Sequence, residues 1–436
     1  MTTNSQNIET LVLHGGSYRN DSATNAVAVP IYQTTSYQFE STEHASKLFS
    51  LQELGNIYTR IMNPTTQVLE ERLAAIEGGM AALAVASGSA AVAMAIQNLA
   101  SAGDNIVASP HLYGGTYNLF TNTLLQMGIE VRFADPEDPK SFETLSDDRT
   151  RAYFGETLPN PKLVPFPIAE VAEIGKKLGI PLIVDNTSAP ITCRPFDHGA
   201  AIIVHSLTKF IGGHGTSIGG AIIDSGNFDW TAKPLQQPLL NTPDNSYHGA
   251  VWAKIIPEAL GAPIAYAIRA RVVLLRDLGA ALSPTNSFQI IQGLETLALR
   301  FREHQRNASK LADYFSSHDA IASVTYPGYF VGQQKQLADK YLTNGYGALI
   351  GVELKGGAEA GCKFIDNLKL VYHVANIGDA RTLAIHPAST THSQLNEEAQ
   401  IRAGVTSGYV RFSVGIEHID DIIEDIDQAL VLAATG

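Results

Sequence analysis

Two apolar runs in the chain lead directly into side chains that could do chemistry. Residues 180–184 are mostly branched or bulky and end at Asp185, and residues 202–204 begin a run that closes at Lys209. Uninterrupted runs of this kind predict buried strands of a parallel sheet covered on both faces. Ligands of open α/β sheets bind outside the carboxyl ends of the strands. We therefore expect the carboxylate and the amine to lie at one crevice.

Two hydroxyl groups beside the lysine complete a set that suits pyridoxal phosphate. The aldehyde of this coenzyme needs a lysine amine, and its pyridine nitrogen needs a carboxylate to remain protonated. Lys209 and Asp185 meet these two needs. The coenzyme phosphate needs hydroxyls and free backbone donors, and Ser206 and Thr208 supply the hydroxyls. A lone lysine and aspartate are more often ordinary solvated residues, so the prediction depends on further segments.

Composition excludes several classes of function. With 436 residues and 45% hydrophobic content, the chain can form two or three domains. The net charge of −13 and the scattered basic residues argue against nucleic-acid or anionic-membrane partners. Cys193 and Cys362 are the only cysteines, which fits a reducing compartment. The first ten residues lack a secretory signal, and no apolar run is long enough to span a membrane. We expect a cytoplasmic protein without a metal site.

The order of apolar and helical segments predicts an α/β fold. Helical stretches, such as residues 66–77, alternate with short strand candidates. This alternation favours a doubly wound, mostly parallel sheet with helices on both faces. The strand candidates are residues 81–85, 105–108, 131–134, 152–155, 182–184, 202–204 and 221–223.

Three regions follow from this pattern. Residues 1–57 are irregular and are expected to form an arm that packs on a partner subunit. Residues 58–282 are expected to form the large coenzyme-binding domain, and its final segment, 257–282, reads as one long helix. Residues 283–436 are expected to form a smaller C-terminal α/β domain that includes a strand at 348–354.

Two further segments could hold the coenzyme. The turn containing Gly88 and Ser89 follows a small-residue strand and precedes an Ala-rich helix, so its backbone N–H groups could bind a phosphate. The alternative is a tight turn that needs glycine only for its geometry. Tyr113 follows the strand at 105–108 and could lay its ring on a flat heterocycle. The alternative is a tyrosine buried in the core.

Two arginines lie at positions where they could bind an anion. Arg60, close to Tyr58, precedes the first helix and could grip a phosphate, although a surface arginine is the simpler interpretation. Arg411 lies within the apolar run 409–414, where burial of a guanidinium costs free energy unless it pairs with a carboxylate. Arg411 could therefore hold the α-carboxylate of a substrate.

Taken together, these segments resemble the Cys/Met-metabolism family of fold-type-I pyridoxal phosphate enzymes, from about His14 to the C-terminus. The likeness lies in residues 205–210, 184–186 and 87–91 and in Tyr113. It implies a fold-type-I enzyme with pyridoxal phosphate bound to Lys209 and its ring nitrogen held by Asp185. It further implies the remaining contacts: Ser206, Thr208, Gly88 and Ser89 on the phosphate, Tyr113 on the ring, Asn160 on the ring hydroxyl, and Arg411 and Asn376 on the substrate.

The resemblance also implies that subunits share their active sites. Tyr58 and Arg60 would reach the coenzyme phosphate of a neighbouring subunit, which requires a homo-oligomer, expected to be a tetramer. The other partners would be small-molecule substrates.

Within the family, the chain is most similar to the O-acetylhomoserine sulfhydrylases. The similar stretches are residues 376–380, 386–392, 243–249 and 293–297. This likeness implies γ-replacement on O-acetyl-L-homoserine by sulfide or a small thiol, with Lys209 as the base and Tyr113 assisting proton transfer. Homocysteine or methionine would be formed in methionine and cysteine biosynthesis.

Other readings of the chain stay open. Methionine γ-lyases typically carry cysteine where this chain has Gly115, which weakens a γ-elimination reading, but cystathionine γ-synthases share the glycine. A noncatalytic pyridoxal phosphate-binding regulator would be expected to lack Lys209 or Arg411, and both are present. A Rossmann nucleotide site is disfavoured because residues 212–219 lack the required glycine spacing.

Overall fold

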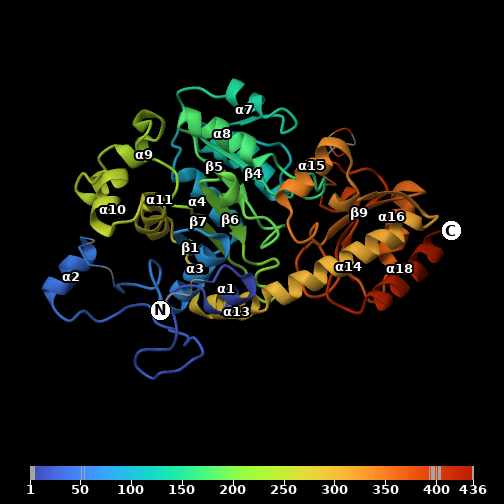
Figure 1. Ribbon diagram of the computed structural model, residues 1–436, viewed down its shortest axis with the longest axis horizontal. Coiled ribbons are helices and arrows are strands. Elements are labelled where there is room, and N and C mark those ends of the chain that lie inside the picture. The colour runs from blue at the N-terminus through green and yellow to red at the C-terminus, as the bar shows by residue number, and fades with distance from the viewer. Residues whose placement is uncertain are drawn as a thin grey trace.

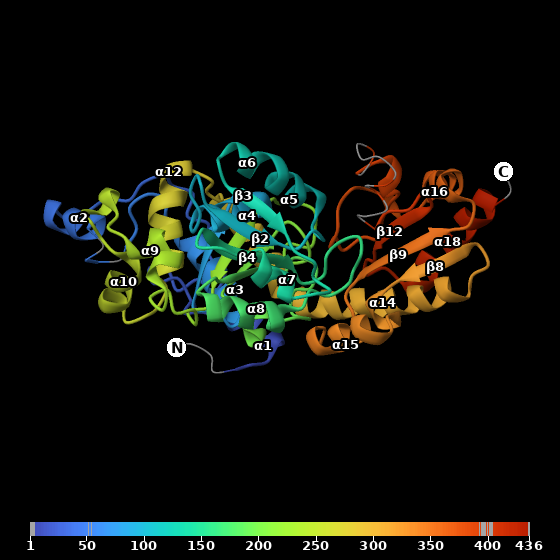
Figure 2. The ribbon, with the colours of Figure 1, turned by 90° about the horizontal axis from the view of Figure 1, so that it is seen from above.

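Two sheets organise the chain, as the computed structural model in Figures 1 and 2 shows. The structure describes residues 5–50, 52–53, 55–391, 393, 398, 400 and 404–434. His392, in one of the stretches used for the family resemblance, lies outside the described residues.

The larger sheet has seven strands in the order β1-β7-β6-β5-β4-β2-β3. The four neighbouring pairs from β6 to β3 are parallel, and β7 is antiparallel to both β6 and β1. The predicted mostly parallel sheet is therefore confirmed. The strands are β1 Ala81–Val85, β2 Asn105–Ala108, β3 Glu130–Phe133, β4 Thr150–Glu156, β5 Leu182–Asp185, β6 Ile202–Ser206 and β7 Gly220–Asp224.

Helices cover both faces of this sheet because its strands are apolar on both sides. Alternate strand residues, such as Val184 and Ile203, pack with α3, α8 and α13 in one core. Their neighbours, such as Ile183 and Ile202, pack with α4 and α11 in a second core. The helices of the larger unit are α3 Pro64–Glu77, α4 Gly88–Gln97, α5 Gly114–Asn118, α6 Leu124–Gln126, α7 Lys140–Thr144, α8 Ile168–Leu178, α9 Pro238–Asn241, α10 Trp252–Leu260, α11 Ala265–Arg269, α12 Arg276–Leu278 and α13 Pro284–Glu295.

The prediction of one long helix at 257–282 is wrong. The structure has α10 ending at Leu260, followed by Gly261 with a φ of +66°. Glycine adopts this left-handed conformation without the steric cost that other residues meet. A second helical stretch then begins with α11 and, through one π-helical segment at Ala270–Leu275, ends at α12.

The N-terminal segment is only partly an arm. α1 (Ile8–His14) places Leu11 and Val12 in the first core of its own chain. Beyond it, the chain runs to α2 (Thr42–Phe49), which lies at the opposite end of the molecule from the C-terminal unit (Figures 1 and 2). Val27 and Phe49 in this stretch are 81% and 62% exposed. Packing of the arm on a partner stays a prediction.

The C-terminal unit contains a five-stranded sheet in the order β10-β11-β12-β9-β8. Val410 and Phe412 of β12 pack with α14, α16 and α18 in a third core, so Arg411 between them points to the opposite face. The elements are β8 Ile321–Thr325, β9 Leu349–Leu354, β10 Tyr372–His373, β11 Leu383–Ile385, β12 Tyr409–Ser413, α14 Leu297–Ser317, α15 Gly332–Tyr341, α16 Gly357–Asp366 and α18 Ile419–Ala434.

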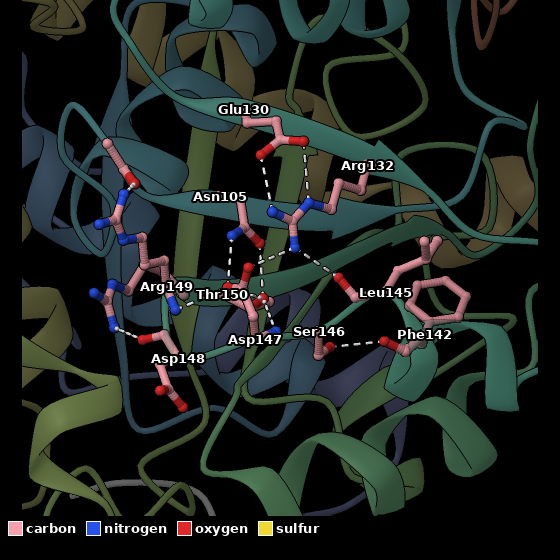
Figure 3. Close-up of polar contacts among 12 residues, drawn as sticks. Asn105, Glu130, Arg132, Phe142, Leu145, Ser146, Asp147, Asp148, Arg149 and Thr150 are labelled. Carbon is pink, nitrogen blue, oxygen red and sulfur yellow. Dashed lines mark hydrogen bonds and ion pairs between the residues drawn. The ribbon is translucent and has the colours of Figure 1, made fainter.

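A polar network ties three strands of the larger sheet at the edge where β2 and β4 begin (Figure 3). Arg132 of β3 donates to Asp147 at 2.8 Å and also pairs with Glu130. Asp147 in turn accepts from Asn105, whose side-chain oxygen accepts from Thr150 at 2.7 Å. These bonds lie at the amino ends of β2 and β4, away from the strand ends that carry Glu156 and Asp185.

One aspartate holds the approach to β10 in place. Asp425 of α18 is buried and accepts the backbone N–H groups of Lys369, Leu370 and Val371 at 2.8, 2.8 and 2.9 Å. We predict that Asp425→Ala lowers the free energy of unfolding by about 3 kcal/mol, because three backbone donors lose a charged acceptor. Denaturant unfolding would measure this change. The exposed Asp421 on the same helix provides the control, and Asp421→Ala should change stability little. Equal effects of both changes would contradict the assignment.

Candidate active site

The ends of β4, β5 and β6 meet around a cavity of about 220 Å³. Residues from the α4 turn and from the C-terminal unit complete its wall. It brings together ten of the predicted site residues: Gly88, Ser89, Tyr113, Asn160, Asp185, Ser206, Thr208, Lys209, Asn376 and Arg411.

One end of the cavity is built to accept an anion. Ser87 caps α4 by accepting the N–H of Ala90 at 3.1 Å, and Gly88 and Ser89, the first two residues of α4, line the cavity at this positive helix end. A Cβ at Gly88 would lie 2.6 Å from Cβ of Ser206. Glycine is therefore needed for the turn to lie against β6. The hydroxyls of Ser206 and Thr208 line the same end.

Lys209 lies in a turn three residues beyond the end of β6, where a strand end was expected. The turn is closed by a hydrogen bond from the Lys209 N–H to the Ser206 carbonyl at 3.3 Å. The Lys209 amine donates to Asn376 Oδ1 at 2.5 Å. Burial, together with the charge of Arg411, lowers the pKa of Lys209 to about 8. A fraction of this amine is therefore neutral, and nucleophilic, near physiological pH.

Arg411 is buried without a carboxylate partner among the described residues. Its Nη2 donates to the Asn376 carbonyl at 2.8 Å, and its buried Nε has no hydrogen-bond partner. Burial lowers the pKa of Arg411 to about 10, so it remains a cation at neutral pH. An unpaired buried guanidinium beside a reactive amine is suited to bind the carboxylate of an amino-acid substrate.

Asp185 lines the same cavity from the end of β5. Its Oδ1 accepts the N–H of Thr187 at 2.9 Å. The hydroxyl of Thr187 accepts the backbone N–H of Ser206 at 2.8 Å, which joins the ends of β5 and β6. Burial raises the pKa of Asp185, while the hydrogen bonds from Thr187 act in the opposite direction.

Tyr113, the residue before α5, lines the cavity. Its N–H donates to Glu156 Oε1 at 2.7 Å, and the residue is 57% exposed. The expected alternative of a core tyrosine is therefore wrong. A Cβ at Gly115 would lie 2.5 Å from Cε1 of Tyr113, so the ring packs directly over this glycine.

Asn160 also lines the cavity, and its buried Oδ1 has no hydrogen-bond partner. It precedes a cis peptide bond to Pro161, whose carbonyl accepts from Tyr409 at 2.9 Å. An unpaired buried acceptor of this kind fits a ligand hydroxyl.

Tyr58 and Arg60 are not brought to Lys209 within one chain. They line a separate cavity of about 340 Å³ together with residues 281–284. The Arg60 guanidinium lies 5.4 Å from the centre of the Tyr58 ring and donates to the Arg276 carbonyl. Their reach into a neighbouring subunit stays a prediction.

Glu156 and Thr187 are among the cavity residues that had no role in the sequence analysis. Glu156 ends a buried strand just as Asp185 does, a signal that could have found it. Thr187 bridges two strands that are distant in sequence, and no local pattern reveals that contact.

The cavity fits pyridoxal phosphate by its own chemistry. It contains a desolvated amine, a carboxylate, a glycine turn at a helix N-terminus, an unpaired amide oxygen and an exposed aromatic ring. These groups match the aldehyde, the ring nitrogen, the phosphate, the ring hydroxyl and the ring face. Within the described residues, no cluster of side chains could hold a metal ion, and no helix is long and apolar enough to cross a membrane.

Comparisons with known proteins agree with this assignment. The chain is 54% identical to an O-acetyl-L-homoserine sulfhydrylase of Leptospira meyeri, with 97% of this chain and 96% of the relative covered. It is 48% identical to a homocysteine synthase of Schizosaccharomyces pombe, over 99% and 100% of the two chains.

A solved structure of a putative O-acetylhomoserine (thiol)-lyase from Campylobacter jejuni is 44% identical and superposes with a TM-score of 0.92, over 98% of this chain and 100% of that one. That structure carries a pyridoxyl-lysine phosphate. The likeness confirms the fold-type-I architecture. The family of Cys/Met metabolism PLP-dependent enzymes matches residues 9–431. The chain therefore belongs to this family, and pyridoxal phosphate is its coenzyme.

Proposed function

We propose that the chain catalyses γ-replacement on O-acetyl-L-homoserine, in which hydrosulfide or a small thiol displaces acetate to give L-homocysteine or methionine. The observation that carries this proposal is the near full-length similarity to a named sulfhydrylase at 54% identity. The cavity supports it because Arg411 and Lys209 are joined through Asn376. A carboxylate on Arg411 therefore brings the α-carbon of an amino acid close to the amine.

Each group in the cavity has a proposed role. Asp185 holds the ring nitrogen of the coenzyme, and the α4 turn with Ser206 and Thr208 holds its phosphate. When bound, the coenzyme supplies an aldehyde that captures the substrate amine and a ring that accepts electrons as protons leave.

The remaining residues handle the substrate and its protons. Arg411 and Asn376 fix the substrate. Lys209 takes protons from the α- and β-carbons and returns them after sulfur has replaced acetate at the γ-carbon. Tyr113 stacks on the ring and assists proton transfer near the leaving group.

The proposal includes a shared-site homo-oligomer, a tetramer in its fullest form, in the cytoplasm. The exposed apolar residues of the arm and the separate cavity around Arg60 support a subunit contact there. Both cysteines are free, which supports a reducing compartment. Light scattering would measure the oligomer size of the unaltered protein and of the Arg60→Ala variant, and would thereby test the proposed subunit contact at Arg60.

Product analysis separates the proposed reaction from its neighbours. With O-acetyl-L-homoserine, we expect homocysteine only when sulfide is present and little 2-oxobutyrate in either case. Mass spectrometry of both products would measure this. Abundant 2-oxobutyrate without sulfide would instead identify a γ-lyase. Cystathionine from O-succinylhomoserine and cysteine would identify a cystathionine γ-synthase.

The lowered pKa of Lys209 predicts the pH dependence of coenzyme uptake. The neutral amine attacks the aldehyde, so the uptake rate of the coenzyme-free protein should rise with pH through about 8. Arg411→Met removes a positive charge, which should raise the pKa of Lys209 and move this rise to higher pH. Arg302→Met, at an exposed position, is the control. A rise centred at pH 10 or above in the unaltered protein would contradict the account.

The contact between Gly115 and Tyr113 predicts a sensitive position. Gly115→Ala should displace the Tyr113 ring and lower kcat on the order of tenfold, or about 1.4 kcal/mol. Gly114→Ala is the matched control, because apart from its two chain neighbours no atom lies within 4 Å of a Cβ there. Steady-state kinetics would measure both. Equal kcat values for the two variants would show that the position of the ring does not matter.

A further inference from the structure

The cavity holds a second carboxylate beside Asp185. Glu156 is the last residue of β4, Asp185 is the last of β5, and the two are register partners in a parallel pair. Register partners project from the same side of a sheet, and both residues line the cavity of Lys209. Glu156 is only 6% exposed.

The two carboxylates have different partners. Asp185 accepts the N–H of Thr187 and is the proposed partner of the cationic ring nitrogen. Glu156 accepts one backbone N–H, that of Tyr113. In the part of the chain that the structure describes, no cation forms an ion pair with Glu156. His111 lines a second cavity with Glu156, but its Nε2 lies 2.8 Å from the Lys162 amine.

Two ionised carboxylates cannot lie side by side in this environment without a large cost. Glu156 is buried and Asp185 is only partly exposed, so repulsion between them is weakly screened and one member of such a pair retains a proton. Asp185 accepts hydrogen bonds from Thr187, and the charge of His205 also favours its ionised form, whereas Glu156 accepts only the backbone N–H of Tyr113. Burial and the charge of Asp185 raise the pKa of Glu156 well above its usual value, which agrees with this assignment.

We propose that Glu156 is a positioning residue that stays protonated beside the ionised Asp185 and fixes the backbone of Tyr113 through its accepting oxygen. This chain of contacts connects the ring of Tyr113 to the carboxylate of Asp185. Tyr113 is bonded to Glu156, Glu156 is held by β4, and β4 is paired in register with β5. These contacts thereby fix the distance between Tyr113, which meets the face of the coenzyme ring, and Asp185, which meets its nitrogen. A single negative charge then lies at the nitrogen.

Two substitutions of Glu156 separate its role as a hydrogen-bond acceptor for Tyr113 from the effect of its charge. Glu156→Gln keeps an acceptor for the Tyr113 N–H and a neutral side chain, and Glu156→Ala removes the acceptor. Glu137→Gln, at an exposed carboxylate that lines the neighbouring cavity, is the control. The readouts are amide hydrogen exchange of residues 109–117, the pH midpoint of the visible coenzyme band, and kcat with KM for O-acetyl-L-homoserine.

The proposal predicts opposite results for the two variants. Glu156→Gln should match the unaltered protein in exchange, keep the pH midpoint within about 0.3 units and keep kcat within about threefold. Glu156→Ala should exchange faster at residues 109–117 and lose about tenfold or more in kcat, with a smaller change in KM.

Two results would overturn the proposal. A midpoint shift of about one unit or more in Glu156→Gln would mean that Glu156 is ionised. Unchanged exchange in Glu156→Ala would mean that Glu156 does not anchor Tyr113. If Glu156→Ala fails to fold, the midpoint of Glu156→Gln decides alone. The kcat readout rests on the proposed function, whereas exchange and the visible band do not, so the two failures are distinguishable.

Discussion

The parallel pairing of β4, β5 and β6 is the constraint on which the site depends. Asp185 is paired with Glu156 on one side and with Val204 on the other. A slip of one residue in either pair would turn the carboxylates toward the opposite face of the sheet. The buried residues of both cores prevent that slip, because each strand is apolar on both faces. Packing far from the chemistry therefore sets the positions of the reactive groups.

The C-terminal unit contributes the substrate side of the cavity by the same logic. Val410 and Phe412 are held in the third core, which leaves Arg411 on the face turned toward Lys209. Asn376 joins the two units, since its side chain accepts from Lys209 and its carbonyl accepts from Arg411. Any relative movement of the units must therefore change the environment of the amine.

Much of the architecture could be predicted from the sequence because it depends on local apolar patterns. The strands at 81–85 and 105–108 are found where they were expected. The strand predicted to end at Lys209 was too long, because the backbone turns after Ser206. The helix expected at 257–282 is broken where Gly261 adopts a left-handed conformation. A single glycine in an apolar pattern does not reveal its backbone angle.

Contacts between distant segments were harder to predict. The role of Glu156 depends on two other residues. Tyr113 lies 43 residues before it in the sequence, and Asp185 lies on the neighbouring strand. The boundary expected at residue 283 stays a prediction, and α13 beyond it packs into the first core with the large sheet. The role of Arg60 depends on a second copy of the chain.

The central claim is that Lys209, beyond the end of β6, carries the coenzyme. The most direct test is borohydride reduction of the coenzyme-loaded protein, followed by proteolysis and mass spectrometric mapping of the modified peptide. The account predicts a phosphopyridoxyl group on Lys209 and on no other lysine in stoichiometric amount. A stoichiometric modification at any other lysine would contradict it.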